Sequence, residues 1–233
     1  MKDAWGRSLM GAVFLLLVFL MARQAGKMTA ASAQANAGRE QPLVFLDPGH
    51  GGFDPGKIGV QGQLEKDLNL EIAQRLRKYL EAMDVRVMMT RETDTQLGES
   101  GEQSKKQADM RARCQMINEA TPDLVVSIHQ NSYHEPEISG GQVFYYQKSE
   151  NGKMLARILQ ERFDYVLGED NRRQPKANDS YYLLLHVKPV ITIVECGFLS
   201  SPEEAKKLTD ADYQERLAWT LAMGIVQYLN NRP

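Results

Sequence analysis

The sequence predicts one α/β domain, with a twisted, mostly parallel, mixed sheet of about six strands and helices on both faces. From Gln41 onward, short apolar runs typical of buried strands alternate with amphipathic stretches at helical spacing. The chain has 233 residues, of which 42% are hydrophobic and 25% charged. This composition supports one ordinary globular core and excludes a disordered protein or a coiled coil. The sequence contains no internal repeat and no sign of a second folded domain.

The first 40 residues are predicted to be a signal peptide or signal anchor followed by a flexible linker. The apolar run Leu9–Ala22 has the length of a signal h-region and is short for a membrane span. Small-x-small patterns at 31–33 and 35–37 fit cleavage sites, although they lie far beyond that run. Cleavage and retention as an anchor both stay open. In either case we expect export across the cytoplasmic membrane, as a secreted protein or one anchored on its outer side. The folded domain is predicted to cover residues 41–233.

The domain begins with a strand, a helix and a second strand. A short β-type run at 43–46 ends in Asp-Pro-Gly and a glycine-rich loop, which indicates a buried strand followed by turns. Leucine and isoleucine residues spaced four apart then predict an amphipathic helix over 64–83. The apolar run 85–89 follows as a strand.

The middle of the domain predicts an exposed loop, a helix and two more strands. The segment 90–106 is polar and contains glycine, so we expect it to be an exposed loop. A second helix follows over about 107–119. The runs 124–128 and 142–146 are rich in β-branched and aromatic residues and predict strands.

The last third predicts three helices and two strands. Apolar residues at helical spacing indicate a helix over 152–167, and short strands are expected at 181–185 and at the β-branched run 190–194. Ser201, followed by proline and by glutamate three residues on, predicts a capping box that begins a short helix. A final helix is expected over about 212–229.

Charge and cysteine content exclude several classes of partner and site. With 28 Lys and Arg against 30 Asp and Glu the net charge is −2, so we expect no nucleic-acid partner and membrane contact only through the N-terminal segment. Cys114 and Cys196 lie far apart, without the spacing of a zinc finger or a disulfide framework. Whether they pair stays open.

Four ionisable residues stand where a ligand site of such a sheet is expected. His50, His129 and Glu195 each follow a predicted strand, and Glu65 begins the first helix. Ligands bind beyond the carboxyl ends of the strands in open α/β sheets. Two imidazoles and a carboxylate suit a catalytic zinc ion, so His50, Glu65 and His129 are candidate ligands, and Glu195 is the candidate general base. Spacing alone leaves this open, since a helix dipole also favours an acid such as Glu65 in the first turn.

Four motifs, in order, carry a family resemblance: LDPGHGGFDPGKIG, the glutamate of LEKDLNLEIA, SIHQNS and VECGFLSSPEE. From about Val44 to the last helix, the chain resembles the zinc-dependent N-acetylmuramoyl-L-alanine amidases, sometimes called the amidase 3 family. The resemblance implies a twisted mixed sheet and one Zn²⁺ per chain, held by His50, Glu65 and His129. It also implies Glu195 as the catalytic residue in cleavage of the amide between N-acetylmuramic acid and L-alanine of peptidoglycan.

Additional residues are candidates for contacts around such a site. Asn131, Arg172 and Asn178 are predicted to bind the glycan strand or its stem peptide, although Arg172 is equally compatible with solvated surface charge. Asp47, like the two asparagines, is a candidate to orient a metal ligand or to hydrogen-bond substrate. Cys196 is not expected to be a nucleophile, because alternation along a strand points it away from the face of Glu195 and into the core.

The stretch RRQPKANDSYYLL, together with the signal-like N-terminus, is similar to the germination-specific amidases that act on the spore cortex of endospore formers. This narrower resemblance implies removal of stem peptides as a step toward muramic δ-lactam, and action in the space between the forespore membranes. The resemblance is also compatible with control of the enzyme by an accessory regulatory protein.

Two rival functions stay open on the residues alone. A zinc peptidase that cuts within stem peptides would use the same metal and base, and it differs by not releasing the intact stem peptide. A non-catalytic peptidoglycan-binding module is expected to lack a ligand or the general base, whereas all four residues are present here.

Overall fold

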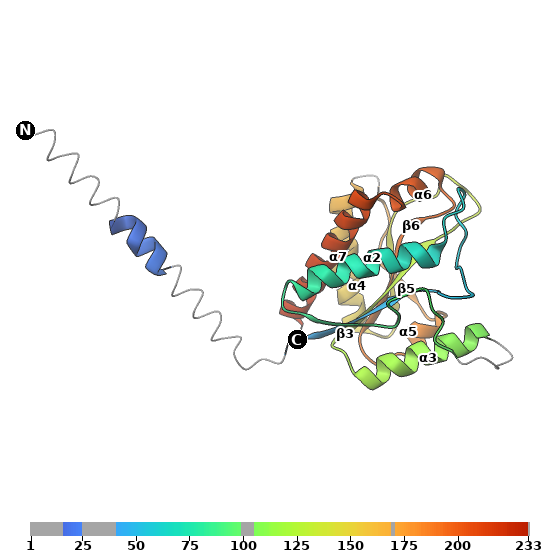
Figure 1. Cartoon of the computed structure of the whole chain (residues 1–233), viewed down its shortest axis with the longest axis horizontal. Coiled ribbons are helices and arrows are strands. Elements are labelled where there is room, and N and C mark those ends of the chain that lie inside the picture. The colour runs from blue at the N-terminus through green and yellow to red at the C-terminus, as the bar shows by residue number, and fades with distance from the viewer. Residues whose placement is uncertain (1–15, 25–40, 99–104, 169–170, 233) are drawn as a thin grey trace, which may run out of the picture. The chain divides into compact units, whose positions relative to one another are not determined.

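The structure, a computed structural model, describes residues 16–24, 41–98, 105–168 and 171–232. The chain divides into two compact units, Met1–Gln41 and Pro42–Pro233. Residues 16–24 of the first unit form a helix (Figure 1). The remainder of the predicted signal segment, with both candidate cleavage sites, lies outside the described residues. Among the described helices, none combines the length and the apolar character that crossing a membrane requires.

One mixed sheet of six strands organises the second unit, in the order β2-β1-β3-β6-β4-β5. The strands are β1 (Leu43–Pro48), β2 (Arg86–Met89), β3 (Leu124–Asn131), β4 (Gln142–Tyr146), β5 (Lys176–Asn178) and β6 (Ile191–Phe198). β2, β1, β3 and β6 pair in parallel, whereas β4 runs antiparallel to β6 and β5 runs parallel to β4. This confirms the predicted α/β class with a mostly parallel, mixed sheet.

Helices cover both faces of the sheet (Figure 1). The helices on one face are α2 (Glu65–Glu81), α4 (Glu150–Leu167), α6 (Pro202–Leu208) and α7 (Ala211–Asn231). On the other face lie α3 (Lys105–Ala120) and α5 (Tyr182–His186). Side chains alternate along β1: Val44 and Leu46 pack in the first core cluster and Phe45 in the second. Since both faces are covered, β1, β3 and β6 are buried along almost their whole length.

One of the six predicted strands, at 181–185, is not a strand in the structure, and the observed strand β5 was not predicted. Residues 181–185 were expected to form a strand, but 182–186 form helix α5. Asn178 causes the change of direction, because its Oδ1 accepts the backbone N–H of Tyr181 at 2.8 Å just before the helix begins. The additional strand is β5, a three-residue edge strand without an apolar pattern, which pairs with β4.

The predicted capping box at Ser201 is also wrong. Ser201 precedes α6, with Pro202 in the first turn, but its hydroxyl makes no capping bond. The carboxylate of Glu204 instead accepts the buried backbone N–H groups of Gly140 at 2.9 Å and Phe198 at 2.8 Å. Buried N–H groups need partners, and these two compete successfully for the glutamate. Glu204 therefore links the loop before β4 to the end of β6.

A third difference concerns the predicted exposed loop 90–106. Its first residues, Thr90 and Arg91, are each only 3% exposed. Their polar groups form hydrogen bonds inside the domain. The polar sequence of the segment predicted exposure, because polarity alone does not reveal such buried partners. The other predicted helices and strands lie within four residues of the observed bounds.

Candidate metal centre

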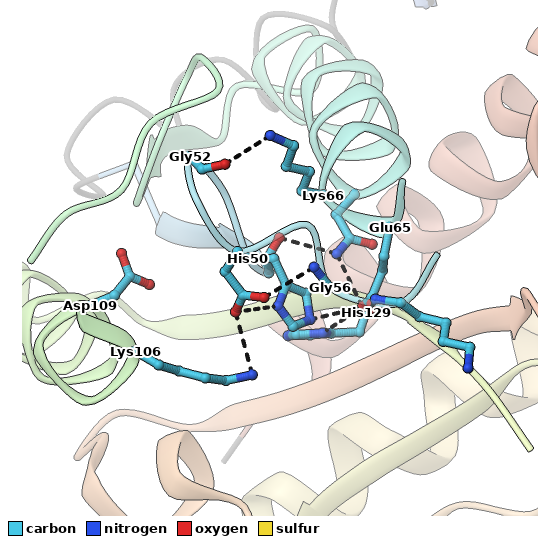
Figure 2. A network of polar contacts seen from close by, with 12 residues as sticks. His50, Gly52, Gly56, Glu65, Lys66, Lys106, Asp109 and His129 are labelled. Atoms are coloured by element: carbon cyan, nitrogen blue, oxygen red, sulfur yellow. Dashed lines mark hydrogen bonds and ion pairs between the residues drawn. The ribbon is translucent and has the colours of Figure 1, made fainter. Parts of the chain in front are cut away.

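His50, Glu65 and His129 come together at the carboxyl ends of β1 and β3, beside the start of α2 (Figure 2). One possible ligand atom from each lies within 4.8 Å of the others. Glu65 Oε1 is 3.2 Å from His50 Nε2 and 2.9 Å from His129 Nδ1. Two imidazole nitrogens and a carboxylate oxygen form a donor set that suits zinc. The residues present therefore fit the ion that the family resemblance implies.

Glu65 is held in place by backbone groups as well as by the histidines. Its Oε2 accepts the N–H of Lys57 at 2.7 Å, and its Oε1 accepts the N–H of Gln130 at 3.1 Å. Burial alone would raise the pKa of Glu65, but hydrogen bonds from His129 and His50 hold that pKa well below its usual range. Glu65 thus stays ionised, which a metal ligand requires.

Asp54, a residue that sequence reasoning did not single out, orients His50. Asp54 Oδ2 lies 2.8 Å from His50 Nδ1, so the ring turns Nε2 toward Glu65. A carboxylate bonded to the far nitrogen is the usual support for a metal-ligating imidazole. Lys106 of α3, labelled in Figure 2, contacts the same carboxylate, since its Nζ lies 3.4 Å from Asp54 Oδ2. The sequence feature that could have identified Asp54 is its position, four residues after His50 in the glycine-rich loop.

Two glycines leave space for the candidate ligands. A Cβ added at Gly49 would lie 2.1 Å from His129 Cε1. At Gly56, whose φ is +68°, a Cβ would lie 2.6 Å from Glu65 Oε2 and 2.7 Å from His50 Cδ2. A larger residue at either position would displace a candidate ligand, so the loop needs glycine here.

Glu195 lies beside the three candidate ligands with one oxygen unpaired. It is opposite His129 in the register of β3 and β6. It is 8% exposed, and its Oε2 has no hydrogen-bond partner among the described residues. Burial raises the pKa of Glu195 to about 7, helped by the charge of Glu65 and opposed by His129 and His50. A carboxyl group with a pKa near neutrality can both accept and return a proton.

Cys196, the neighbour of Glu195, belongs to the core on the opposite face of the sheet. Cys114 packs in the other core cluster, and both cysteines are buried and free. Burial raises the pKa of the Cys196 thiol, so it stays protonated. The predicted orientation of Cys196, away from the site, is confirmed.

The three candidate ligands and Glu195 line a cavity of about 440 Å³. Asn131 also lines it, and its Oδ1 accepts the N–H of Ser132. Arg172 and Asn178 are not among the described residues around this cavity. Arg172 is exposed, and Asn178 supports the turn before α5. Roles of these three residues in substrate binding stay predictions.

A larger hollow of about 990 Å³ is lined by α6, α7 and the loop before β4. Neither the candidate ligands nor Glu195 line it.

Comparisons with known proteins identify the family of the chain. Residues 44–227 match the family described as N-acetylmuramoyl-L-alanine amidase. The germination-specific N-acetylmuramoyl-L-alanine amidase of Bacillus subtilis strain 168 is 38% identical over 193 residues, covering 82% of this chain and 81% of that protein. The CwlD amidase from Clostridioides difficile, solved in complex with the GerS lipoprotein, is 35% identical with a TM-score of 0.79, covering 82% of this chain and 99% of that one.

A second solved structure, the N-acetylmuramoyl-L-alanine amidase from Clostridium difficile 630, is 29% identical. It superimposes with a TM-score of 0.73 over 84% of this chain and 100% of that one. The family match covers more than half of the chain and includes β1 from its second residue and the other five strands in full. With this fold and this site, the chain belongs to the N-acetylmuramoyl-L-alanine amidase family and is an enzyme of that type.

Proposed function

We propose that the enzyme cleaves the amide between N-acetylmuramic acid and L-alanine with one zinc ion, held by His50, Glu65 and His129, and with Glu195 as general base. One observation carries the residue assignments: three donor atoms converge in a cavity that also contains the unpaired Oε2 of Glu195. Family membership supports the reaction, and the donor set supports the metal.

The chain's own residues have distinct tasks in this reaction. When bound, zinc supplies Lewis-acid chemistry, which polarises a carbonyl and makes water easier to deprotonate. Glu195 takes the proton of the attacking water at Oε2 and later delivers it to the departing amine of L-alanine. Glu65 contributes a fixed negative charge, and Asp54 keeps His50 in the tautomer that presents Nε2.

Product analysis tests the proposed bond. The purified full chain, supplied with zinc, is incubated with peptidoglycan, and the released peptides are identified by mass spectrometry. We expect the intact stem peptide with a free amino group on its L-alanine. Peptides cut between two amino acids would instead identify a zinc peptidase. Binding to peptidoglycan without any release would contradict the proposed cleavage by the purified chain on its own.

We propose spore cortex as the substrate, so that the reaction is a step toward muramic δ-lactam. The 38% identity to a germination-specific amidase and the stretch RRQPKANDSYYLL support this. We also propose that the enzyme acts outside the cytoplasmic membrane, secreted or anchored, in the space between the forespore membranes. The C. difficile amidase was solved with a lipoprotein, which supports an accessory protein for this chain as well.

Complementation tests the cortex role. The full chain is expressed during sporulation in an endospore former that lacks its own germination-specific amidase. Muramic δ-lactam is then measured in the cortex by muropeptide analysis. We expect δ-lactam to return with the unmodified chain and not with Glu195→Gln. Production of the unmodified protein without δ-lactam would contradict the proposed role in cortex.

A further inference from the structure

Two buried arginines surround the short segment that carries His50. Arg113 of α3 is 2% exposed, and Arg91, which follows β2, is 3% exposed. A guanidinium removed from water needs partners for its N–H groups. In this domain many of those partners are backbone carbonyls of residues 48–50, the last residue of β1 and the two that follow it.

Arg113 contacts this segment from the side of α3. Its Nη1 donates to the carbonyl oxygen of Pro48 at 2.9 Å, and its Nη2 donates to that of His50 at 2.5 Å. Its charge is balanced by two carboxylates, Asp47 Oδ1 and Asp109 Oδ2, each at 2.6 Å. Arg113 therefore joins α3 directly to the backbone of a candidate metal ligand.

Arg91 contacts the same segment from another direction. Its Nε donates to the carbonyl of Pro48, and its Nη2 donates to that of Gly49, both at 3.0 Å. All three successive carbonyls from Pro48 to His50 thus accept a hydrogen bond from a buried guanidinium. His50 needs such support, because its φ of +62° is a conformation that residues other than glycine rarely adopt.

Asp47 supports the segment of His50 indirectly, through Arg113. It does not orient an imidazole through any described hydrogen bond. Its Oδ1 accepts the hydroxyl of Thr90 and a guanidinium N–H of Arg113, and its Oδ2 accepts the hydroxyl of Ser127 at 2.6 Å. Asp47 therefore fixes Arg113, which in turn fixes the segment of His50.

We propose that Arg113 is a positioning residue, which holds His50 in its ligand geometry and makes the metal affinity of the centre depend on α3. The inference rests on the proposed metal centre. It differs from a purely structural role, because it requires metal binding to weaken in protein that is still folded.

Two variants and a control separate these roles. Arg113→Lys keeps a positive charge beside Asp47, but a compact ammonium cannot serve two carboxylates and two carbonyls at once. Arg113→Met removes the charge and every hydrogen bond. Arg75→Met is the matched control, because Arg75 joins α2 to Gln214 and Glu215 of α7 and makes no described contact with residues 48–50.

The experiment measures zinc affinity of the full chain by competition with a chromophoric chelator, under conditions where circular dichroism shows each variant folded. Cobalt absorption spectra report the ligand geometry independently of activity. We expect Arg113→Lys to bind zinc about 10-fold more weakly, as for loss of other groups that orient metal ligands, with a changed cobalt spectrum. Arg113→Met is expected to bind still more weakly, and Arg75→Met to bind like the unmodified chain.

The outcomes distinguish this inference from the metal centre on which it rests. No zinc binding by the unmodified chain would contradict the centre itself. Equal zinc affinity and equal cobalt spectra for the unmodified chain and folded Arg113→Lys would overturn the role of Arg113 alone. If Arg113→Met does not fold, the lysine variant still decides the question.

Discussion

Glu65 and Glu195 are buried carboxylates of the same cavity, yet their surroundings move their pKa values in opposite directions. Glu65 accepts hydrogen bonds from two imidazoles and two backbone N–H groups, so its pKa is lowered despite burial. Glu195 has an unpaired oxygen, and burial raises its pKa to about 7. The environment thus suits one carboxylate to hold a cation and the other to move a proton.

Removal of the Asp54 carboxylate is predicted to weaken metal binding. Asp54→Ala leaves His50 Nδ1 without its partner, so we expect zinc affinity to fall by about 10- to 100-fold. Asp123→Ala is the control, because Asp123 bonds Leu43 and Arg232 at the other end of the parallel strands. Chelator competition measures both. Zinc affinities that fall equally in the two variants would contradict a specific role for Asp54.

Single residues of the site differ in how far the sequence reveals them. His50, His129 and Glu195 come after apolar runs of the sequence and lie in family motifs, so they could be singled out as candidates. Asp54 has one sequence signal, its place four residues after His50, whereas Arg113 has none, because its importance comes from contacts formed only in the folded domain. A polar residue in a loop or on a helix surface has the same local signature whether it is solvated or buried against backbone.

At the scale of elements, short apolar runs are ambiguous between strand and helix. The run at 181–185 is too short for its length to distinguish a strand from a helix. In the structure the turn formed by Asn178 precedes helix α5. Long amphipathic helices such as α2 and α7 are identified more easily, because several turns repeat the same spacing. Strand β5 has no apolar pattern, and only its pairing with β4 defines it.

Two serines that precede helices are predicted to differ in their contribution to stability. Ser149 caps α4, since its side chain accepts the N–H of Gly152 at 2.9 Å, whereas Ser201 makes no capping bond to α6. We expect Ser149→Ala to lower the free energy of unfolding by about 1 kcal/mol. Ser201→Ala is expected to lower it by less than Ser149→Ala does, because no capping bond is lost. Urea denaturation measures both, and a larger loss for Ser201→Ala would contradict the assignment of the caps.

For the whole molecule, the strand order assembles the site. β1, β3 and β6 are neighbours in parallel, so the residues that follow or end them meet at one edge of the sheet. The presence of buried strands could be predicted from their apolar runs. Their order could not, because pairing depends on contacts between segments about 80 residues apart in sequence, such as Ser127 with Asp47.

The stability of the whole domain is predicted to depend on the ionised form of Asp47. Burial opposes ionisation, but Arg113, Ser127 and Thr90 hold the pKa of Asp47 below its usual value of 3.8. Because the folded pKa is the lower one, this stabilisation is present above that usual, unfolded value and is lost as pH falls through the folded pKa.

Asp47→Asn tests this dependence. The substitution leaves the buried charge of Arg113 with one carboxylate fewer, so we expect the free energy of unfolding to fall by about 3 kcal/mol at pH 7. The loss of stability below pH ~4 is expected to be shallower than in the unmodified chain. Urea unfolding of the chelator-treated protein across pH measures both. Parallel pH profiles would contradict the assignment to Asp47.

The most direct test of the site is zinc content and amidase activity measured on the same preparations of the full chain, Glu195→Gln and His129→Ala. We predict about one zinc per chain in the first two proteins and little in His129→Ala. Activity is predicted only for the unmodified chain, with Glu195→Gln reduced by about 10²- to 10⁴-fold. Undiminished activity of Glu195→Gln, or an active unmodified enzyme without zinc, would contradict the account.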